Sequence, residues 1–206
     1  MNEKTTPTEK IKELRNLSCA GIMDCKKALA DANGQLQKAL EILQQKGLTS
    51  ADKKTTRLAK EGLIECYLHT GGKLGAIIEI NCETDFVAKQ QKFQDLAKNI
   101  AMQIAACPAV KYIRTEDIPN EVINLEKNIE SSKDDLNKKT EDIKEKIITN
   151  RTKKKLAELT LLNQAYIRDP SITVEELIKQ HIAILGENIQ IRRFQRFELG
   201  ETQKHN

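Results

Sequence analysis

The sequence predicts an α+β protein, with an N-terminal three-helix module followed by a core in which helices pack on a small antiparallel sheet. Three observations predict this fold class. Residues 8–47 carry matched apolar stripes at helical spacing, Gly71-Gly72 separates two apolar runs as in a β-hairpin, and a long helical stripe follows that hairpin. We therefore expect a module in residues 1–50, a linker in 51–61 and a core in 62–206.

The module is expected to contain three short helices. Thr8 can cap the first helix, and Cys19-Ala20-Gly21 can form the turn that follows it. The second and third helices are expected to end at Gly34 and Gly47, because glycine is common just past a helix end. The apolar stripes are narrow and rich in alanine, so they predict a small module. They comprise Ile11 and Leu14, then Cys25, Ala28, Leu29 and Ala32, and finally Leu36, Ala39, Leu40 and Leu43.

A hairpin follows the polar linker. Two apolar runs, Leu63 to His69 and Leu74 to Cys82, flank the turn Thr70-Gly71-Gly72-Lys73. The second run alternates, which places Leu74, Ala76, Ile78, Ile80 and Cys82 on one face of the sheet. The glycines do not form a phosphate-binding loop, because the sequence lacks the Gly-Lys-Ser/Thr ending that opens a helix in such loops.

The corner from Asn81 to Ala88 is the most informative segment of the chain. The strand stops at Thr84-Asp85, two residues that favour helix N-termini, and Phe86 falls in the first turn of the helix that begins there. Only 3% of the residues are aromatic, so an outward Phe86 would be expected to contact a partner. Alternatively, Phe86 plugs the local core, and the spacing alone does not decide between the two.

The helix after this corner has a clear apolar face. It is expected to lie on the sheet and to end at Pro108, before a candidate strand in Ala109 to Ile113. The face consists of Phe93, Leu96, Ala97, Ile100, Ala101 and Ile104.

Residues 116–165 predict a helical excursion from the core. Val122, Ile129, Leu136 and Ile143 recur every seven positions, but Leu125 is the only apolar residue at the other seam position. This pattern indicates long helices or a thinly packed helical hairpin.

The chain then returns to the core. Thr173 and Glu176 fit a capping box at the start of a helix that Gly186 ends. Ile189 to Leu199 is expected to be the last strand. Its three arginines are interpreted as edge charges that oppose sheet-to-sheet pairing, or alternatively as contacts to an acidic partner. They are Arg192, Arg193 and Arg196.

Composition excludes several classes of function. The net charge is only +4, from 34 basic and 30 acidic residues, so it does not indicate a dedicated nucleic-acid-binding protein. No apolar tract is long enough to cross a bilayer, and the polar start Met1 to Lys12 predicts no secretory signal. The basic run Arg151 to Lys155 remains a candidate RNA contact, although such runs more often form a solvated helix face.

No constellation typical of catalysis or of metal binding is present. The five cysteines include no CxxC pair, and the three histidines lie far from one another in the sequence, so we expect no metal site, no cofactor and no enzymatic activity. Cys25 falls on an apolar stripe, which argues against a reactive thiolate. Cys66 and Cys82 fall on facing strands of the predicted hairpin and are expected to be small core residues.

Three segments of the chain resemble the elongation factor Ts family. The first comprises Ile11 to Arg15 (IKELR) with Ala20 to Leu29 (AGIMDCKKAL). The second runs from Asn81 to Lys89 (NCETDFVAK) and the third from Gly186 to Phe194 (GENIQIRRF). The chain departs from the family in having Cys19 where a glycine is usual, which puts the geometry of the following turn in doubt.

The resemblance implies a fold and a partner. It implies that the N-terminal module is similar to ubiquitin-associated domains, and that the protein is a short form with one core subdomain. It also implies a guanine nucleotide exchange factor that binds elongation factor Tu with GDP, displaces Mg²⁺ and so promotes GDP release. Short forms tend to pair, so a homodimer is expected.

The resemblance also implies the site residues. Thr84, Asp85, Phe86 and Val87 would approach the GTPase domain of elongation factor Tu, with Phe86 acting as a wedge. Three residues of the module would dock on another helix of the same domain. These docking residues are Arg15, Ile22 and Met23, and Ile22 stands where many members have a second methionine.

Two other hypotheses stay open at this stage. Residues 8–47 could form an interaction module for ubiquitin-like or ribosomal partners, or the chain could bind RNA or the ribosome through Arg151 to Lys155 and Arg192 to Arg196. A thiol enzyme is a weaker third. The expected compartment is the cytoplasm, or alternatively the plastid stroma or mitochondrial matrix if the protein is organelle-encoded.

Overall fold

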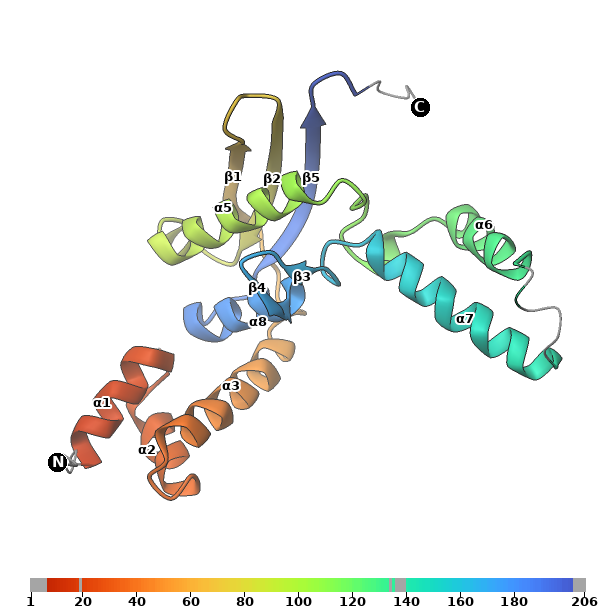
Figure 1. The fold of residues 1–206 in the computed structure, drawn as a ribbon. Coiled ribbons are helices and arrows are strands. Elements are labelled where there is room, and N and C mark those ends of the chain that lie inside the picture. Colours follow the sequence, from red (N-terminus) through yellow and green to blue (C-terminus); the bar gives the residue numbers. More distant parts are fainter. Residues whose placement is uncertain (1–6, 19, 134, 136–139, 202–206) are drawn as a thin grey trace. The chain divides into compact units, whose positions relative to one another are not determined.

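The computed structural model describes residues 7–18, 20–133, 135 and 140–201, which form the α+β fold that the sequence predicts (Figure 1). Helices α1 to α3 come first, and a three-stranded sheet packed by helices follows. The chain divides into two compact units. The first consists of Met1–Glu65, Glu79–Ala97 and Glu176–Arg192, and the second of Cys66–Ile78, Lys98–Glu175 and Arg193–Asn206.

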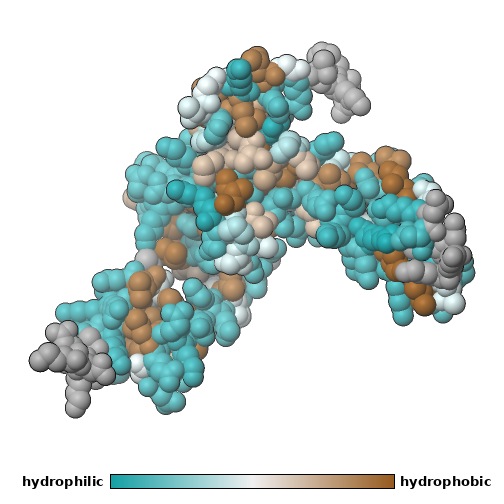
Figure 2. All heavy atoms as spheres, viewed as in Figure 1, coloured by the Kyte–Doolittle hydropathy of each residue, from teal (hydrophilic) through white to brown (hydrophobic). Residues whose placement is uncertain are grey.

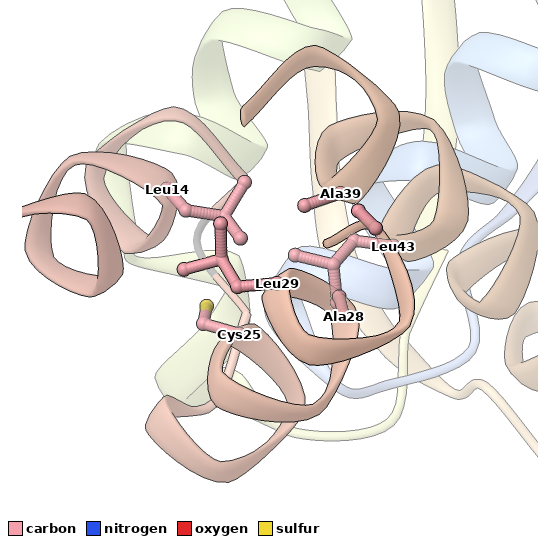
Figure 3. Packing of buried hydrophobic residues seen from close by; sticks show 7 residues of the cluster. Leu14, Cys25, Ala28, Leu29, Ala39 and Leu43 are labelled. Atoms are coloured by element: carbon pink, nitrogen blue, oxygen red, sulfur yellow. The ribbon is translucent and has the colours of Figure 1, made fainter. Parts of the chain in front are cut away.

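The N-terminal module has a small core of leucine, alanine and one cysteine. Its helices are α1 (Pro7–Ser18), α2 (Ile22–Asp31) and α3 (Leu36–Asp52). The predicted stripes are confirmed, because all their residues are buried or pack against the buried cluster. The cluster (Figure 3) contains Leu14, Cys25, Ala28, Leu29, Ala32, Ala39 and Leu43.

Two predicted helix boundaries in the module are wrong. Helix α1 begins at Pro7, so Thr8 lies inside its first turn, and proline is favoured at a first helical position because its missing N–H needs no partner there. Helix α3 continues through Gly47 to Asp52. A Cβ at Gly47 would stand only 3.1 Å from the Cβ of Ala183, so the glycine allows close packing instead of ending the helix. Cys19 lies outside the described residues.

The sheet is built from β1 (Glu61–Leu68), β2 (Leu74–Cys82) and β5 (Gln190–Glu198), in the order β1-β2-β5. The hairpin turn is confirmed, since the amide of His69 donates to the carbonyl of Leu74 at 2.8 Å. The amide of Leu199 donates to the carbonyl of Lys73, so β5 ends where β2 begins and the two run antiparallel.

Helix α5 (Gln91–Ala106) supplies the other half of the core. The six residues of its predicted apolar face are completely buried, as are Ile80 and Cys82 of the alternating strand β2. The boundary between the two units crosses both α5 and β2. Cys66 is exposed, so its prediction as a core residue is wrong.

The helical excursion is a hairpin of two helices, α6 (Asn120–Ser131) and α7 (Glu141–Glu158), which contact each other. Leu125, Ile129 and Ile143 remain exposed, so the predicted thin packing is confirmed for these positions. Leu136 lies outside the described residues. A short 3₁₀ turn, η1 (Thr115–Asp117), precedes the hairpin.

The segment before the excursion does not form the strand that we expected in Ala109 to Ile113. Tyr112 makes only an isolated parallel bridge to Thr160. The segment instead follows the end of α7, where the carbonyl of Leu159 accepts hydrogen bonds from the amides of Lys111 and Tyr112.

The chain returns through a small β-ribbon and a last helix. Strands β3 (Ala165–Tyr166) and β4 (Asp169–Thr173) pair antiparallel, and α8 (Val174–Leu185) starts directly after Thr173. Gly186 ends α8 as predicted, with a φ of +82°.

The arginines of β5 have different environments. Arg192 is exposed on this edge strand, as an edge charge would be. Arg196, however, is largely buried, and its guanidinium donates to the carbonyl of Ala105 at 3.1 Å and pairs with Glu198 at 2.6 Å. Arg196 is therefore part of the structure of the core and is not a free edge charge.

Candidate functional site

The strand-to-helix corner turns one large apolar side chain outward. Thr84 is the N-cap of the short helix α4 (Asp85–Ala88), and its Oγ1 accepts a hydrogen bond from the amide of Val87 at 3.4 Å. The side chain of Phe86 is 77% exposed, whereas Val87 is only 5% exposed. The alternative in which Phe86 plugs the local core is therefore excluded, and Val87 is the residue that anchors the corner from within.

A charged pair flanks Phe86. Lys89 donates from Nζ to the Oδ2 of Asp85 at 2.7 Å, one helical turn away, and both side chains are exposed. This hydrogen bond, together with the charge of Lys89, lowers the pKa of Asp85 below its usual value. Asp85 therefore presents a carboxylate beside the exposed ring.

The backbone before Phe86 is held by a distant carboxylate. Oε2 of Glu187 accepts hydrogen bonds from the amides of Glu83 (3.1 Å) and Thr84 (3.0 Å), and its Oε1 accepts from the hydroxyl of Thr84 at 2.6 Å. Glu187 follows α8 and lies more than a hundred residues away in the sequence. Charge-assisted hydrogen bonds of this kind are stronger than neutral ones, so Glu187 fixes the corner firmly.

A reciprocal set of bonds holds the segment that carries Glu187. Oε1 of Glu83 accepts from the amide of Asn188 at 2.6 Å, and the Arg57 guanidinium stands 3.6 Å from the same oxygen. Asn188 is completely buried, and its Nδ2 donates to the carbonyls of Thr55 and Arg57. We call Glu83, Glu187 and Asn188 the brace.

Cys82 lies directly before the brace and is not reactive. Burial, with a smaller contribution from the charge of Glu187, raises the pKa of its thiol to about 11. Its Sγ donates to the carbonyl of Thr84 at 3.1 Å, which adds one more bond to the corner. Cys82 is thus a structural thiol, because a nucleophilic cysteine needs a lowered pKa and an open environment.

The three predicted docking residues are exposed on the N-terminal module. Arg15 lies on α1, one position after the buried Leu14, and Ile22 and Met23 form the first turn of α2. Met23 is 74% exposed and Ile22 is 54% exposed. The site residues therefore lie on two different surfaces, one on α1 and α2 and the other on α4.

Sequence reasoning found the corner but not the brace. Glu83, Glu187 and Asn188 all lie in segments that resemble the family, but the sequence predicted no role for them. No periodicity links positions that are a hundred residues apart, so only the fold brings these residues together. The only local indication of a role was their position, with Glu83 directly after β2 and Glu187 and Asn188 just after α8.

Within the described ranges, no cluster of three or more histidine, cysteine or acidic side chains could hold a metal ion. Over the same part of the chain, no helix is both long and apolar enough to span a bilayer.

Comparison with known proteins gives one consistent result. Residues 5–201 match the model of the family described as elongation factor TS. The chain is 63% identical over 191 residues to a protein of Guillardia theta named "Elongation factor Ts, chloroplastic", covering 93% of this chain and 87% of the relative. It is 61% identical to the elongation factor Ts of Picosynechococcus sp. and 57% identical to that of Synechocystis sp., in each case over 93% of this chain and 88% of the relative.

Proposed function

The chain belongs to the elongation factor Ts family, and from this membership we propose that its strand-to-helix corner drives nucleotide exchange on elongation factor Tu. The protein is a nucleotide exchange factor of translation elongation and not an enzyme, since it makes and breaks no covalent bond. The observation that carries the proposal is the exposure of Phe86, at 77%, on a corner that the brace holds rigidly.

The wedge acts on the Mg²⁺ of the partner. Asp85 and Phe86 press against helices beside the nucleotide site of the GTPase domain, and the resulting shift displaces the ion. Mg²⁺ bridges the phosphates and neutralises much of their charge, so GDP is poorly held after the ion is lost. GTP then rebinds and the factor is released.

Binding of the factor and of GDP is coupled. A factor that binds the empty GTPase more tightly than the GDP form must itself be weakened by GDP in the same ratio. The corner therefore needs no chemistry of its own. It needs a rigid apolar group and a nearby carboxylate, which Phe86 and Asp85 supply.

The module supplies affinity separately. Arg15, Ile22 and Met23 dock on another helix of the same GTPase domain, and the exposed apolar side chains of Ile22 and Met23 support this role. Thr84 and Val87 contribute to the site from within the corner, Thr84 as the N-cap and Val87 as the buried anchor.

We also infer a homodimer and a compartment. Large apolar side chains stay exposed on strands β1 and β5, where Figure 2 shows apolar surface at the hairpin end, and a second copy would cover them. The protein acts in the cytoplasm or, as the name of the Guillardia theta relative suggests, in a plastid stroma.

The decisive experiment measures release of fluorescent GDP from elongation factor Tu. We expect wild-type protein to accelerate release strongly. At a saturating concentration of Phe86→Ala, the maximal rate should be at least about tenfold lower, because an aromatic ring that becomes buried in a partner is typically an interface hot spot.

The outcomes of this experiment distinguish the exchange function itself from the location of the surface that carries it. Acceleration that survives Phe86→Ala would keep the exchange function and move the active surface away from the corner. No acceleration by wild-type protein with a cognate partner would overturn the exchange mechanism.

A further inference from the structure

We propose that Glu187 is a positioning residue for nucleotide exchange, and that it sets the orientation of Phe86 by fixing the proton of the Thr84 hydroxyl. This inference rests on the proposed function of Phe86. It adds a residue from a distant part of the sequence, whose carboxylate bonds Glu83 and Thr84 directly before Phe86. The exchange surface is thereby built from two segments that are about a hundred residues apart in the chain.

The hydrogen bonds of Thr84 have a fixed direction. Glu187 is a carboxylate that can only accept, so the Thr84 hydroxyl must donate its proton to Oε1 at 2.6 Å. The lone pairs of Oγ1 are then free to accept from the amide of Val87, which caps α4. Glu187 therefore fixes the place and the proton of the hydroxyl that caps α4.

Phe86 depends on this cap because its own packing cannot orient it. Its side chain is mostly exposed, and α4 has only four residues, too few to be stable alone. The direction of the ring follows from the backbone between the capped Thr84 and the buried Val87. Loss of the cap would let that turn fray and the ring move.

Glu187 is in turn held on a rigid support. It follows Gly186 at the end of α8, and its neighbour Asn188 is completely buried and bonded to the carbonyls of Thr55 and Arg57. The amide of Asn188 also donates to the carboxylate of Glu83. Each of the two segments therefore supplies a carboxylate that accepts from backbone amides of the other. The carboxylate of Glu187 thus has a fixed place from which to orient Thr84.

The test compares Glu187→Met, which keeps the length of the side chain but removes its acceptors, with wild type in the GDP-release assay. We expect the maximal rate at saturating factor to fall roughly tenfold to a hundredfold, since small misplacement of a working group has effects of that size. The half-saturating concentration should change little, because the docking residues are intact. Glu121→Met, the same change at an exposed glutamate of α6, should leave both quantities unchanged.

A double substitution separates positioning from general stability. If Glu187 works only through Phe86, adding Glu187→Met to Phe86→Ala should cause no further fall in the maximal rate. Circular dichroism and thermal melting establish that each variant is folded. If Glu187→Met does not fold, Glu187→Gln replaces it, because glutamine keeps the shape of the side chain and one acceptor oxygen. The maximal rate of Glu187→Gln should also fall, but by a smaller factor.

Three results are distinguishable. A folded Glu187→Met or Glu187→Gln with the full maximal rate would overturn the positioning role while leaving Phe86 as the wedge. A further multiplicative loss in the Phe86→Ala background would also overturn it, because Glu187 would then act by another route. Failure of wild-type protein to accelerate release, or full activity of Phe86→Ala, would instead count against the proposed function.

Discussion

Phe86 and Val87 are neighbours in the sequence with opposite environments, and this contrast lies at the centre of the site. Burying Val87 stabilises the corner, and the same turn leaves the ring of Phe86 in solvent. The capped turn already fixes the backbone of Phe86, so binding a partner costs little backbone entropy, and the exposed ring offers most of its apolar surface to that partner. The contrast between the buried Val87 and the exposed Phe86 therefore suits the proposed role of Phe86 as a wedge.

The docking residues should affect affinity and leave the maximal rate unchanged. We expect Met23→Ala and Arg15→Ala to raise the half-saturating concentration of factor by roughly five- to thirtyfold, the effect of losing about 1–2 kcal/mol of interface energy. The maximal rate of GDP release should stay near that of wild type. A titration of factor against a fixed concentration of elongation factor Tu with fluorescent GDP measures both quantities.

Phe86→Ala is the matched comparison in that titration, because it should lower the maximal rate more than it changes half-saturation. Equal loss of maximal rate in Phe86→Ala and Arg15→Ala would sink the division of labour between the corner and the module.

At the scale of elements, β1 and β2 approach each other too closely for any side chain at Gly62. This residue has a φ of +144°, and an added Cβ would overlap the carbonyl oxygen of Ile80 and stand 2.7 Å from the Cα of Asn81. Both contacts are to backbone, which cannot move without disturbing the strand that leads into the corner. The glycine therefore couples the edge strand to the site.

We expect Gly62→Ala to destabilise the protein by more than about 2 kcal/mol, because overpacking against backbone adds to the strain of the positive φ. The Tm should fall by at least about 5 °C for a chain of this size. Thermal melting followed by circular dichroism measures the change.

Gly71→Ala is the control for Gly62→Ala. Its φ of +94° is also strained, but an added Cβ meets nothing within 4 Å, so only the conformational cost of about 1 kcal/mol remains. Equal Tm values for the two variants would show that the close approach at Gly62 is not what matters.

The basic run in α7 is another element whose role changes once its partners are known. Arg151 pairs with Asp135 at 2.5 Å and stands near the buried Glu130, and Lys155 pairs with Glu158 at 2.9 Å. Two of its four cations are therefore already neutralised within the second unit, which weakens the RNA-binding hypothesis. Arg151 joins α7 to Glu130 of α6 and to Asp135 beyond it, whereas Lys155 pairs within α7.

Across the whole molecule, local patterns were predicted well and contacts between distant segments were not. The stripe of α5 and the alternation of β2 follow directly from the periods of helix and strand, and both were predicted residue by residue. By contrast, Gly47 within α3 packs closely against Ala183, and the brace joins residues 83 and 187. No sequence period carries such information.

The division into a module in 1–50, a linker in 51–61 and a core in 62–206 remains a prediction. The two compact units do not follow it, because the first unit combines the module with parts of the core. The buried cluster of the module is small and contains mostly alanine and leucine, so the module by itself would bury little apolar surface.

Self-association is the property of the whole molecule that the exposed sheet residues predict. Leu68 at the end of β1 is 67% exposed, and Phe197 on β5 and Leu199 beyond it are exposed as well. Burying such side chains against a second copy removes apolar surface from water, at about 25 cal/mol per Å². We expect wild-type protein to sediment at twice the 23.3 kDa of one chain, and Leu68→Lys to shift the equilibrium toward monomer.

Leu58→Lys is the matched control, because Leu58 is 71% exposed but lies in the segment before β1, outside the sheet. A monomeric wild type throughout the concentrations used for exchange, or an equal shift in the two variants, would remove the sheet residues as the dimer contact while leaving the exchange mechanism intact, since Phe86 lies on a different element.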